Sequence, residues 1–95
     1  GAGRAMPAKK GRPPRIVFPL DASLVALPQA GRSIGLSAEG GRRPLTWLVD
    51  GAPLAARKWN RVAKWRPDGP GFTEIVLIDA LGRRAAARVR LVRAE

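Results

Sequence analysis

The sequence predicts an all-β fold, an immunoglobulin-like antiparallel β-sandwich of six to eight short strands. Three observations support this prediction. Short apolar runs recur along the chain and are separated by glycine, proline and aspartate, which favour turns. Several of these runs alternate between apolar and polar residues, which is the period of a half-buried strand. No segment shows a sustained helical period.

The chain of 95 residues has the size of one domain with a linker before it. Residues 1–15 are basic and rich in proline and lack an apolar period, so we expect a flexible linker there. The apolar period begins at Ile16. We therefore assign residues 16–95 to the folded sandwich.

Three strands are expected in the first half of the chain. Residues 16–18 form the first strand, which ends at Pro19 because proline cannot donate to a ladder. Residues 24–27 form a short second strand. Residues 33–38 alternate, and their apolar side consists of Ile34, Leu36 and Ala38.

A hairpin is predicted in the middle of the chain. Residues 45–49 form its first strand, and residues 52–54 run back at a sheet edge. Asp50 and Gly51 lie between them and are a strong signal for a two-residue turn. Trp47 has apolar neighbours, and we expect it in the core, like the central tryptophan of immunoglobulin sandwiches.

Residues 55–66 leave two alternatives open, a helical turn or an irregular edge strand. Because the elements on both sides are hairpins, we favour strand-like or irregular structure for this segment.

The last third predicts a second hairpin. Residues 72–78 are apolar on both sides, which suits a central strand that is covered twice. Its two sides consist of Phe72, Val76 and Ile78, and of Ile75 and Leu77. In residues 84–92, small or apolar residues alternate with arginines. The predicted core side consists of Ala85, Ala87, Val89 and Leu91, and the exposed row of Arg84, Arg88 and Arg90.

The composition argues against catalysis by this fragment. The chain contains no histidine and no cysteine, which removes the commonest general base, the commonest metal ligand and all thiolate chemistry. Most carboxylates lie in predicted turns, where their side chains bond the local backbone. A glycosidase-type pair would require two of them to share one pocket. We expect no catalytic residue, no cofactor and no metal site.

Three segments carry a family resemblance. Residues 15–22 contain an opening strand and a Pro-x-Asp turn, and residues 44–54 contain Trp-x-x-Asp-Gly-x-Pro-Leu. Residues 65–83 contain Trp-x-Pro and close on Asp-Ala-x-Gly-Arg. In this order, the segments resemble the C-terminal domain of bifunctional class A penicillin-binding proteins of the 1C type. Ala22 replaces the glycine that is usual in that family, which leaves the type of the first turn open.

This resemblance implies a non-catalytic, immunoglobulin-like module that follows glycosyltransferase and transpeptidase domains in the periplasm. The transpeptidase pattern, a serine three residues before a lysine, is absent from the fragment. No apolar run approaches the ~18 residues of a membrane span, so an inner-membrane anchor of the parent protein would lie outside this fragment. The implied role is a binding module in peptidoglycan biosynthesis at the cell wall. Its partners would be an envelope protein, peptidoglycan glycan or its own catalytic domains.

The strongest candidates for contact lie in residues 57–66, a basic segment that contains two tryptophans. Indole faces beside cations stack on sugar rings or pack on a protein partner. The alternative is that each tryptophan covers an end of the sandwich beneath a basic side-chain stem. The candidate binding residues are Arg57, Trp59, Arg61 and Trp65.

The net charge of +11 favours anionic partners. Basic residues with interleaved aromatics are also typical of nucleic-acid binding, but no nucleic-acid-binding motif is present. A small basic nucleic-acid-binding β-domain is therefore the alternative function, which we rank below the binding module.

Overall fold

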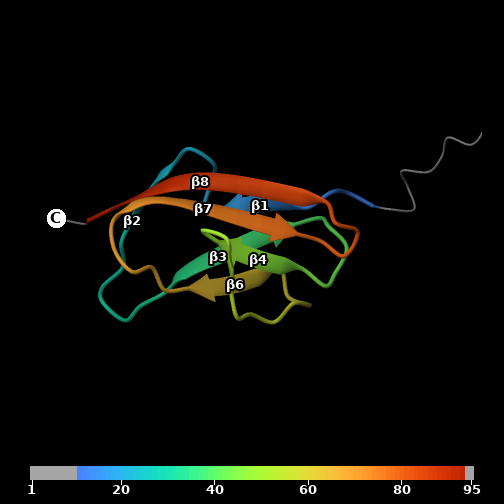
Figure 1. Ribbon diagram of the computed structural model, residues 1–95, viewed down its shortest axis with the longest axis horizontal. Coiled ribbons are helices and arrows are strands. Elements are labelled where there is room, and N and C mark those ends of the chain that lie inside the picture. The colour runs from blue at the N-terminus through green and yellow to red at the C-terminus, as the bar shows by residue number, and fades with distance from the viewer. Residues whose placement is uncertain (1–10, 94–95) are drawn as a thin grey trace, which may run out of the picture.

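The computed structural model describes residues 11–93, and this part of the chain contains eight strands (Figure 1). They are β1 (Arg15–Phe18), β2 (Leu24–Ala26), β3 (Ile34–Glu39), β4 (Thr46–Val49), β5 (Ala52–Pro53), β6 (Val62–Trp65), β7 (Gly71–Ile78) and β8 (Arg84–Val92). The predicted all-β fold class is confirmed. Within residues 11–93 there is no helix of the length and apolarity that crossing a membrane would require.

The strands form two sheets that pack face to face. One sheet has the order β1-β3-β6 and the other the order β2-β8-β7-β4-β5. The pairings are antiparallel except that β2 runs parallel to β8. The core between the sheets consists of Ile16, Ile34, Leu36, Ala38, Leu45, Trp47, Ala63, Trp65, Ile75, Leu77, Ala87, Val89 and Leu91.

Strand alternation decides which side chains enter this core. The predicted core side of β3 is buried throughout, and that of β8 is buried except for Ala85, which is half-buried. Trp47 is 2% exposed, as expected for a central core residue. Its indole N–H has no hydrogen-bond partner among the described residues, so Trp47 stabilises the sandwich through packing.

The predicted hairpin at Asp50 and Gly51 is confirmed. Both residues have positive φ, 50° and 85°, which is the signature of a type I′ turn. The N–H of Asp50 donates to the carbonyl of Glu74 at 2.8 Å. In return, the N–H of Glu74 donates to Asp50 Oδ1 at 2.9 Å. The turn is thereby tied to β7, and β5 lies at the edge of the five-stranded sheet, as Pro53 predicts.

Residues 55–66 adopt the strand-like and irregular structure that the pattern favours. The segment crosses from β5 in one sheet to β6 in the other. A single hydrogen-bonded turn lies in between, where the N–H of Asn60 donates to the carbonyl of Arg57 at 3.1 Å. This turn carries Trp59 on the outside of the sandwich.

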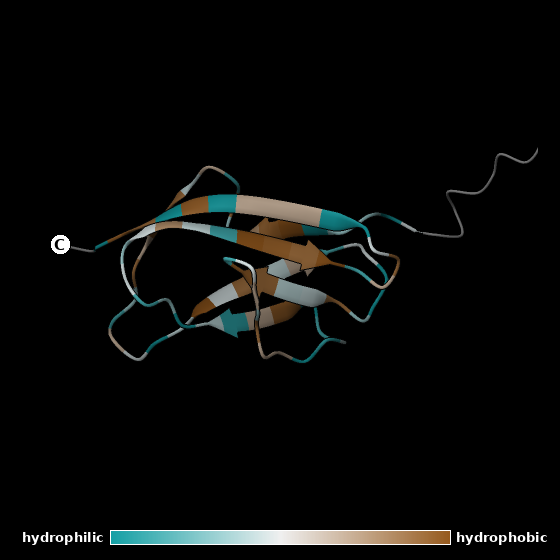
Figure 2. Ribbon diagram, in the orientation of Figure 1, coloured by the Kyte–Doolittle hydropathy of each residue, from teal (hydrophilic) through white to brown (hydrophobic). Residues whose placement is uncertain are grey.

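The outward side of β7 is not covered by a second layer within residues 11–93, contrary to expectation. Phe72 on that side is 67% exposed. Val76 is only 7% exposed, because Leu48 and Ala86 flank it on the neighbouring strands. The apolar run of β7 (Figure 2) therefore serves two purposes, core packing on one side and an apolar sheet surface on the other.

Residues 11–14, which belong to the predicted linker, pack against the sandwich. Pro14 is buried, and the N–H of Gly41 donates to the carbonyl of Arg12 at 2.8 Å. Gly41 has a φ of +75°, and a Cβ at this position would lie 2.9 Å from the Cβ of Pro14. Glycine thus permits the close approach. Residues 1–10 of the predicted linker lie outside the described residues.

The turn after β1 docks on β8. The N–H of Ala22 donates to the carbonyl of Arg88 at 2.7 Å, and the N–H of Arg88 donates to Asp21 Oδ1 at 2.8 Å. Ala22 has a φ of +64°. This left-handed conformation costs a residue with a Cβ about 1–2 kcal/mol. The position is one where glycine relieves strain, which accounts for the glycine that is usual in the resembled family.

We therefore predict that Ala22→Gly raises the free energy of unfolding by about 0.5–1 kcal/mol, because the relief of strain exceeds the entropic cost of glycine. Urea denaturation measures the change. The matched control is Ala26→Gly in β2, where the backbone is extended and the same substitution should destabilise the domain. Destabilisation by Ala22→Gly would contradict the strain argument.

Candidate binding surface

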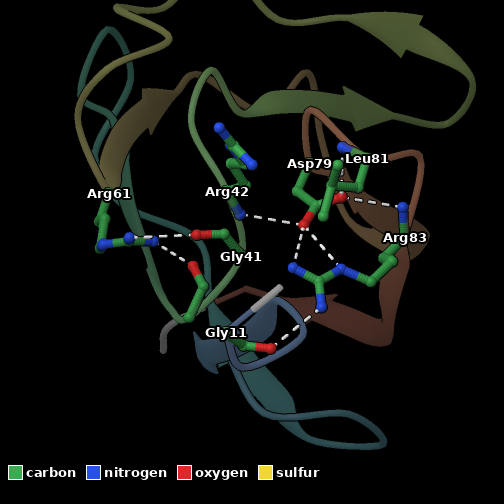
Figure 3. A network of polar contacts seen from close by, with 8 residues as sticks. Gly11, Gly41, Arg42, Arg61, Asp79, Leu81 and Arg83 are labelled. Atoms are coloured by element: carbon green, nitrogen blue, oxygen red, sulfur yellow. Dashed lines mark hydrogen bonds and ion pairs between the residues drawn. The ribbon is translucent and has the colours of Figure 1, made fainter. Parts of the chain in front are cut away.

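A buried carboxylate organises one end of the sandwich (Figure 3). The side chain of Asp79 is 0% exposed and lies in the turn between β7 and β8. Its Oδ1 accepts the N–H groups of Leu81 and Arg83 at 3.0 and 2.9 Å. Its Oδ2 accepts the N–H of Arg42 at 2.9 Å and the guanidinium of Arg83 at 2.9–3.0 Å. The Asp-Ala-x-Gly-Arg motif is therefore a structural device in which the first and last side chains bind each other.

The hydrogen bonds also set the ionisation of Asp79. Burial by itself raises the pKa of this carboxyl group, because the charged form loses its hydration. The N–H groups of Arg42 and Arg83, the Arg83 guanidinium and the N–H of Leu81 outweigh burial and hold the pKa below its ordinary value of 3.8. Asp79 is thus charged at neutral pH.

The same network reaches the loop between β3 and β4. The N–H of Ala80 donates to the carbonyl of Arg42 at 2.8 Å. From the opposite side, the Arg61 guanidinium donates to the carbonyl of Gly40 and, at 3.2 Å, to that of Gly41 (Figure 3). The loop at residues 40–45 is therefore held between Asp79 and Arg61.

This loop in turn supports the turn that carries Trp59. The N–H of Leu45 donates to the carbonyl of Lys58 at 2.8 Å. The guanidinium of Arg43 donates to the carbonyl of Trp59 at 3.0 Å. The backbone of Trp59 is thus anchored while its side chain remains 64% exposed.

The four predicted binding residues separate into two groups. Arg57 and Trp59 lie in the same turn and are exposed. Arg61 is half-buried and donates to backbone carbonyls, so it positions the loop at residues 40–45. Trp65 is 7% exposed and packs in the core, where it offers little surface to a ligand. The structure therefore brings two of the four, Arg57 and Trp59, to one surface.

An open apolar hollow of about 690 Å³ lies beside this turn, on the outward face of the three-stranded sheet. Gly35 lies in it, and a Cβ there would meet no atom within 4 Å. We call it the Gly35 hollow. Its further lining residues are Phe18, Leu36, Ser37, Ala55, Ala56, Arg57, Asn60, Val62, Ala63 and Lys64. A volume of this size is typical of ligand sites.

Phe18 lines the hollow because of an irregularity that the sequence pattern does not show. The register of β1 against β3 shifts between Ile16 and Phe18. In a regular strand, residues two apart share a face, so Phe18 would follow Ile16 into the core. The bulge turns Phe18 outward instead, where it pairs with Ser37 and is 47% exposed.

The carboxylates of the described residues serve mainly structural roles. Asp21, Asp50 and Asp79 accept backbone N–H groups, and Glu39 pairs with Arg15. In residues 11–93, no cluster of three or more potential metal ligands exists. The arrangement can bind a partner through shape, an exposed indole and positive charge.

The sandwich is similar to solved structures of two bacterial proteins. The fibronectin(III)-like modules of Clostridium thermocellum CbhA match it with 16% identity and a TM-score of 0.57, over 86% of this chain and 99% of that chain. SGBP-B, from a mixed-linkage glucan utilization locus of Bacteroides ovatus and solved in complex with a mixed-linkage heptasaccharide, matches with 11% identity and a TM-score of 0.55. The match covers 87% of this chain and 25% of SGBP-B. The likeness to fibronectin(III)-like modules supports the immunoglobulin-like sandwich architecture, which the two domain types share.

The Penicillin-Binding Protein C-terminus Family matches residues 4–91. The chain belongs to this family, which confirms the resemblance carried by its three motifs. No curated protein matches the chain.

We predict that Asp79→Asn lowers the free energy of unfolding by about 2–4 kcal/mol, because an amide cannot satisfy all the donors that surround the buried carboxylate. Urea denaturation at neutral pH measures this loss. Asp68→Asn, at an exposed carboxylate, is the control and should change stability little.

The lowered pKa of Asp79 also predicts a pH dependence. A carboxyl group whose pKa is lower in the folded than in the unfolded state stabilises the fold fully above the unfolded value of about 3.8. That contribution is lost as the pH falls through the folded-state pKa. In Asp79→Asn, the free energy of unfolding should therefore fall less steeply as the pH drops below about 4. An equally steep acid loss in Asp79→Asn and in the unmodified chain would contradict this assignment.

Proposed function

We propose that this domain is a non-catalytic accessory module of a periplasmic peptidoglycan synthase of the penicillin-binding protein 1C type. It works by contact with peptidoglycan glycan or with an envelope protein. The contact surface consists of Trp59, Arg57 and the Gly35 hollow. Membership in the Penicillin-Binding Protein C-terminus Family supports the setting.

One observation carries the proposal, which is the presentation of Trp59. Trp59 is 64% exposed, while two hydrogen bonds from the loop at residues 40–45 anchor its turn. Because the backbone of the turn is already anchored, little further loop ordering is needed when a ligand binds the exposed side chain. Within residues 11–93, no arginine lies over the Trp59 ring, so the ring is free to stack on a sugar or on a partner's side chain.

The hollow adds shape to this surface. Gly35 and the outward-turned Phe18 line a recess, and Arg57 and Lys64 bring positive charge to it. SGBP-B, which contains a similar sandwich, was solved in complex with a mixed-linkage heptasaccharide, and this shared architecture supports a glycan as the ligand.

We predict that Trp59→Ala weakens binding to purified peptidoglycan sacculi by about tenfold or more, as expected for an anchored aromatic contact. Its free energy of unfolding should change by less than about 0.5 kcal/mol, because the side chain is exposed. Co-sedimentation with sacculi and thermal unfolding measure the two effects. Leu20→Ala, at another exposed apolar residue, is the matched control.

Gly35→Val tests the hollow separately. A Cβ at Gly35 has open space around it, and valine favours strands, so the variant should fold with unchanged or higher stability. It should also weaken sacculus binding, because valine fills the recess. Unchanged binding in both variants would place the contact elsewhere. Tight DNA binding that falls steeply with salt, together with no binding to sacculi, would favour the nucleic-acid alternative.

A further inference from the structure

The outward face of the five-stranded sheet is a second surface, on the sheet opposite the Gly35 hollow. Its side chains stand in rows that the strand register defines. These rows are Leu24–Arg90–Phe72, Arg88–Glu74, Ala86–Val76–Leu48–Pro53 and Arg84–Ile78–Thr46. We call this surface the arginine face.

The arginine face has an apolar centre between positive ends. Val76 is 7% exposed, and Leu48 and Ile78 beside it are half-buried. The apolar side chains at the centre therefore form a flat surface and do not protrude from the sheet. Arg84 lies at one end, and Arg88 and Arg90 lie at the other. Among residues 11–93, none of these three arginines forms an ion pair, and the rows contain a single carboxylate, Glu74. The face therefore presents unpaired positive charge around an apolar patch.

Phe72 contacts two of these charges. The guanidinium carbons of Arg88 and Arg90 lie over its ring, 5.7 and 5.6 Å from the ring centre. Both guanidinium groups therefore lie beside an aromatic ring that is itself exposed, with Phe72 at 67%. Guanidinium groups beside apolar surface are suited to carboxylates, which they bind in bidentate geometry.

We infer that the arginine face docks a protein surface with an apolar centre and with carboxylates placed to meet Arg84, Arg88 and Arg90. Flat, partly apolar surfaces with arginine and aromatic residues are typical of protein–protein contacts. A second copy of this chain that docked through the same face would be repelled by the same arginines. A lipid surface would require protruding apolar side chains across the whole face. Leu24 and Phe72 protrude at one end, but Val76 at the centre is only 7% exposed. This inference concerns a different surface from the proposed function and stands independently of it.

The test is a titration of the ¹⁵N-labelled domain, followed by amide chemical shifts, with a short peptide of alternating glutamate and valine. A peptide with glutamine in place of glutamate is the control probe. The glutamate peptide should shift the amides of residues 72–78 and 84–90. The glutamine peptide should bind with an affinity at least about tenfold lower. Arg88→Glu combined with Arg90→Glu should abolish these shifts.

The matched control is Arg57→Glu combined with Lys64→Glu, which changes the net charge equally at the Gly35 hollow and should leave the shifts in place. Thermal unfolding shows that each variant is folded, and Arg84→Glu gives a second, independent variant of the face. Shifts centred on residues 57–64, equal binding of the glutamine peptide, or equally strong binding of anionic vesicles or DNA to the arginine face would overturn the inference. The Arg88→Glu and Arg90→Glu double variant should still bind sacculi. Loss of peptide binding with retained sacculus binding would therefore concern the arginine face and leave the proposed function untouched.

Discussion

The charge of Asp79 is the constraint on which one end of the sandwich depends. A carboxylate with no exposed surface is tolerated only when its oxygens accept a full set of hydrogen bonds. The donors come from the turn after β7 and from the loop after β3, and the Arg83 guanidinium also reaches the carbonyl of Gly11 at 3.2 Å. Segments far apart in the sequence are therefore fixed by one side chain. Because the loop after β3 supports the Trp59 turn, the network also positions the candidate binding surface.

The two outward faces of the sandwich differ because of a few local residues. On the three-stranded sheet, a glycine and a bulge create a recess beside the turn that carries Trp59. On the five-stranded sheet, Ala86 between arginines leaves a flat apolar centre with positive ends. The core residues are similar in character on both sheets, so the proposed binding chemistry lies in the outward faces and loops. Two distinct surfaces on one small domain would allow it to contact two partners at once.

Much of the fold could be predicted because it follows from local rules. Strand alternation in β3 and β8 identified the core side chains, and Asp50-Gly51 located a hairpin turn. The outward side of β7 could not be predicted, because apolar residues on both sides of a strand do not show whether a second layer exists. Val76 is shielded by its own sheet neighbours, which only the register reveals.

The candidate site was predictable only in part. Trp59 and Trp65 have similar sequence surroundings, but strand alternation places Trp65 in the core, while Trp59 lies in a turn with its indole outside. The role of Arg61 depends on the carbonyls of Gly40 and Gly41, which are distant in sequence. Phe18 and Gly35 were missed because a bulge and a space above a glycine leave no periodic signal. Gly35 inside an alternating strand is the one hint, since such a glycine often marks a close approach or an open site.

The most direct test of this account is an NMR pH titration of the Asp79 carboxyl carbon together with the amide protons of Arg42, Leu81 and Arg83. If the buried carboxylate holds these segments, all four signals will titrate together, with a midpoint below the ordinary aspartate value of 3.8. A midpoint at or above that value, with amide signals that do not follow the carboxyl group, would show that Asp79 does not organise this end of the domain.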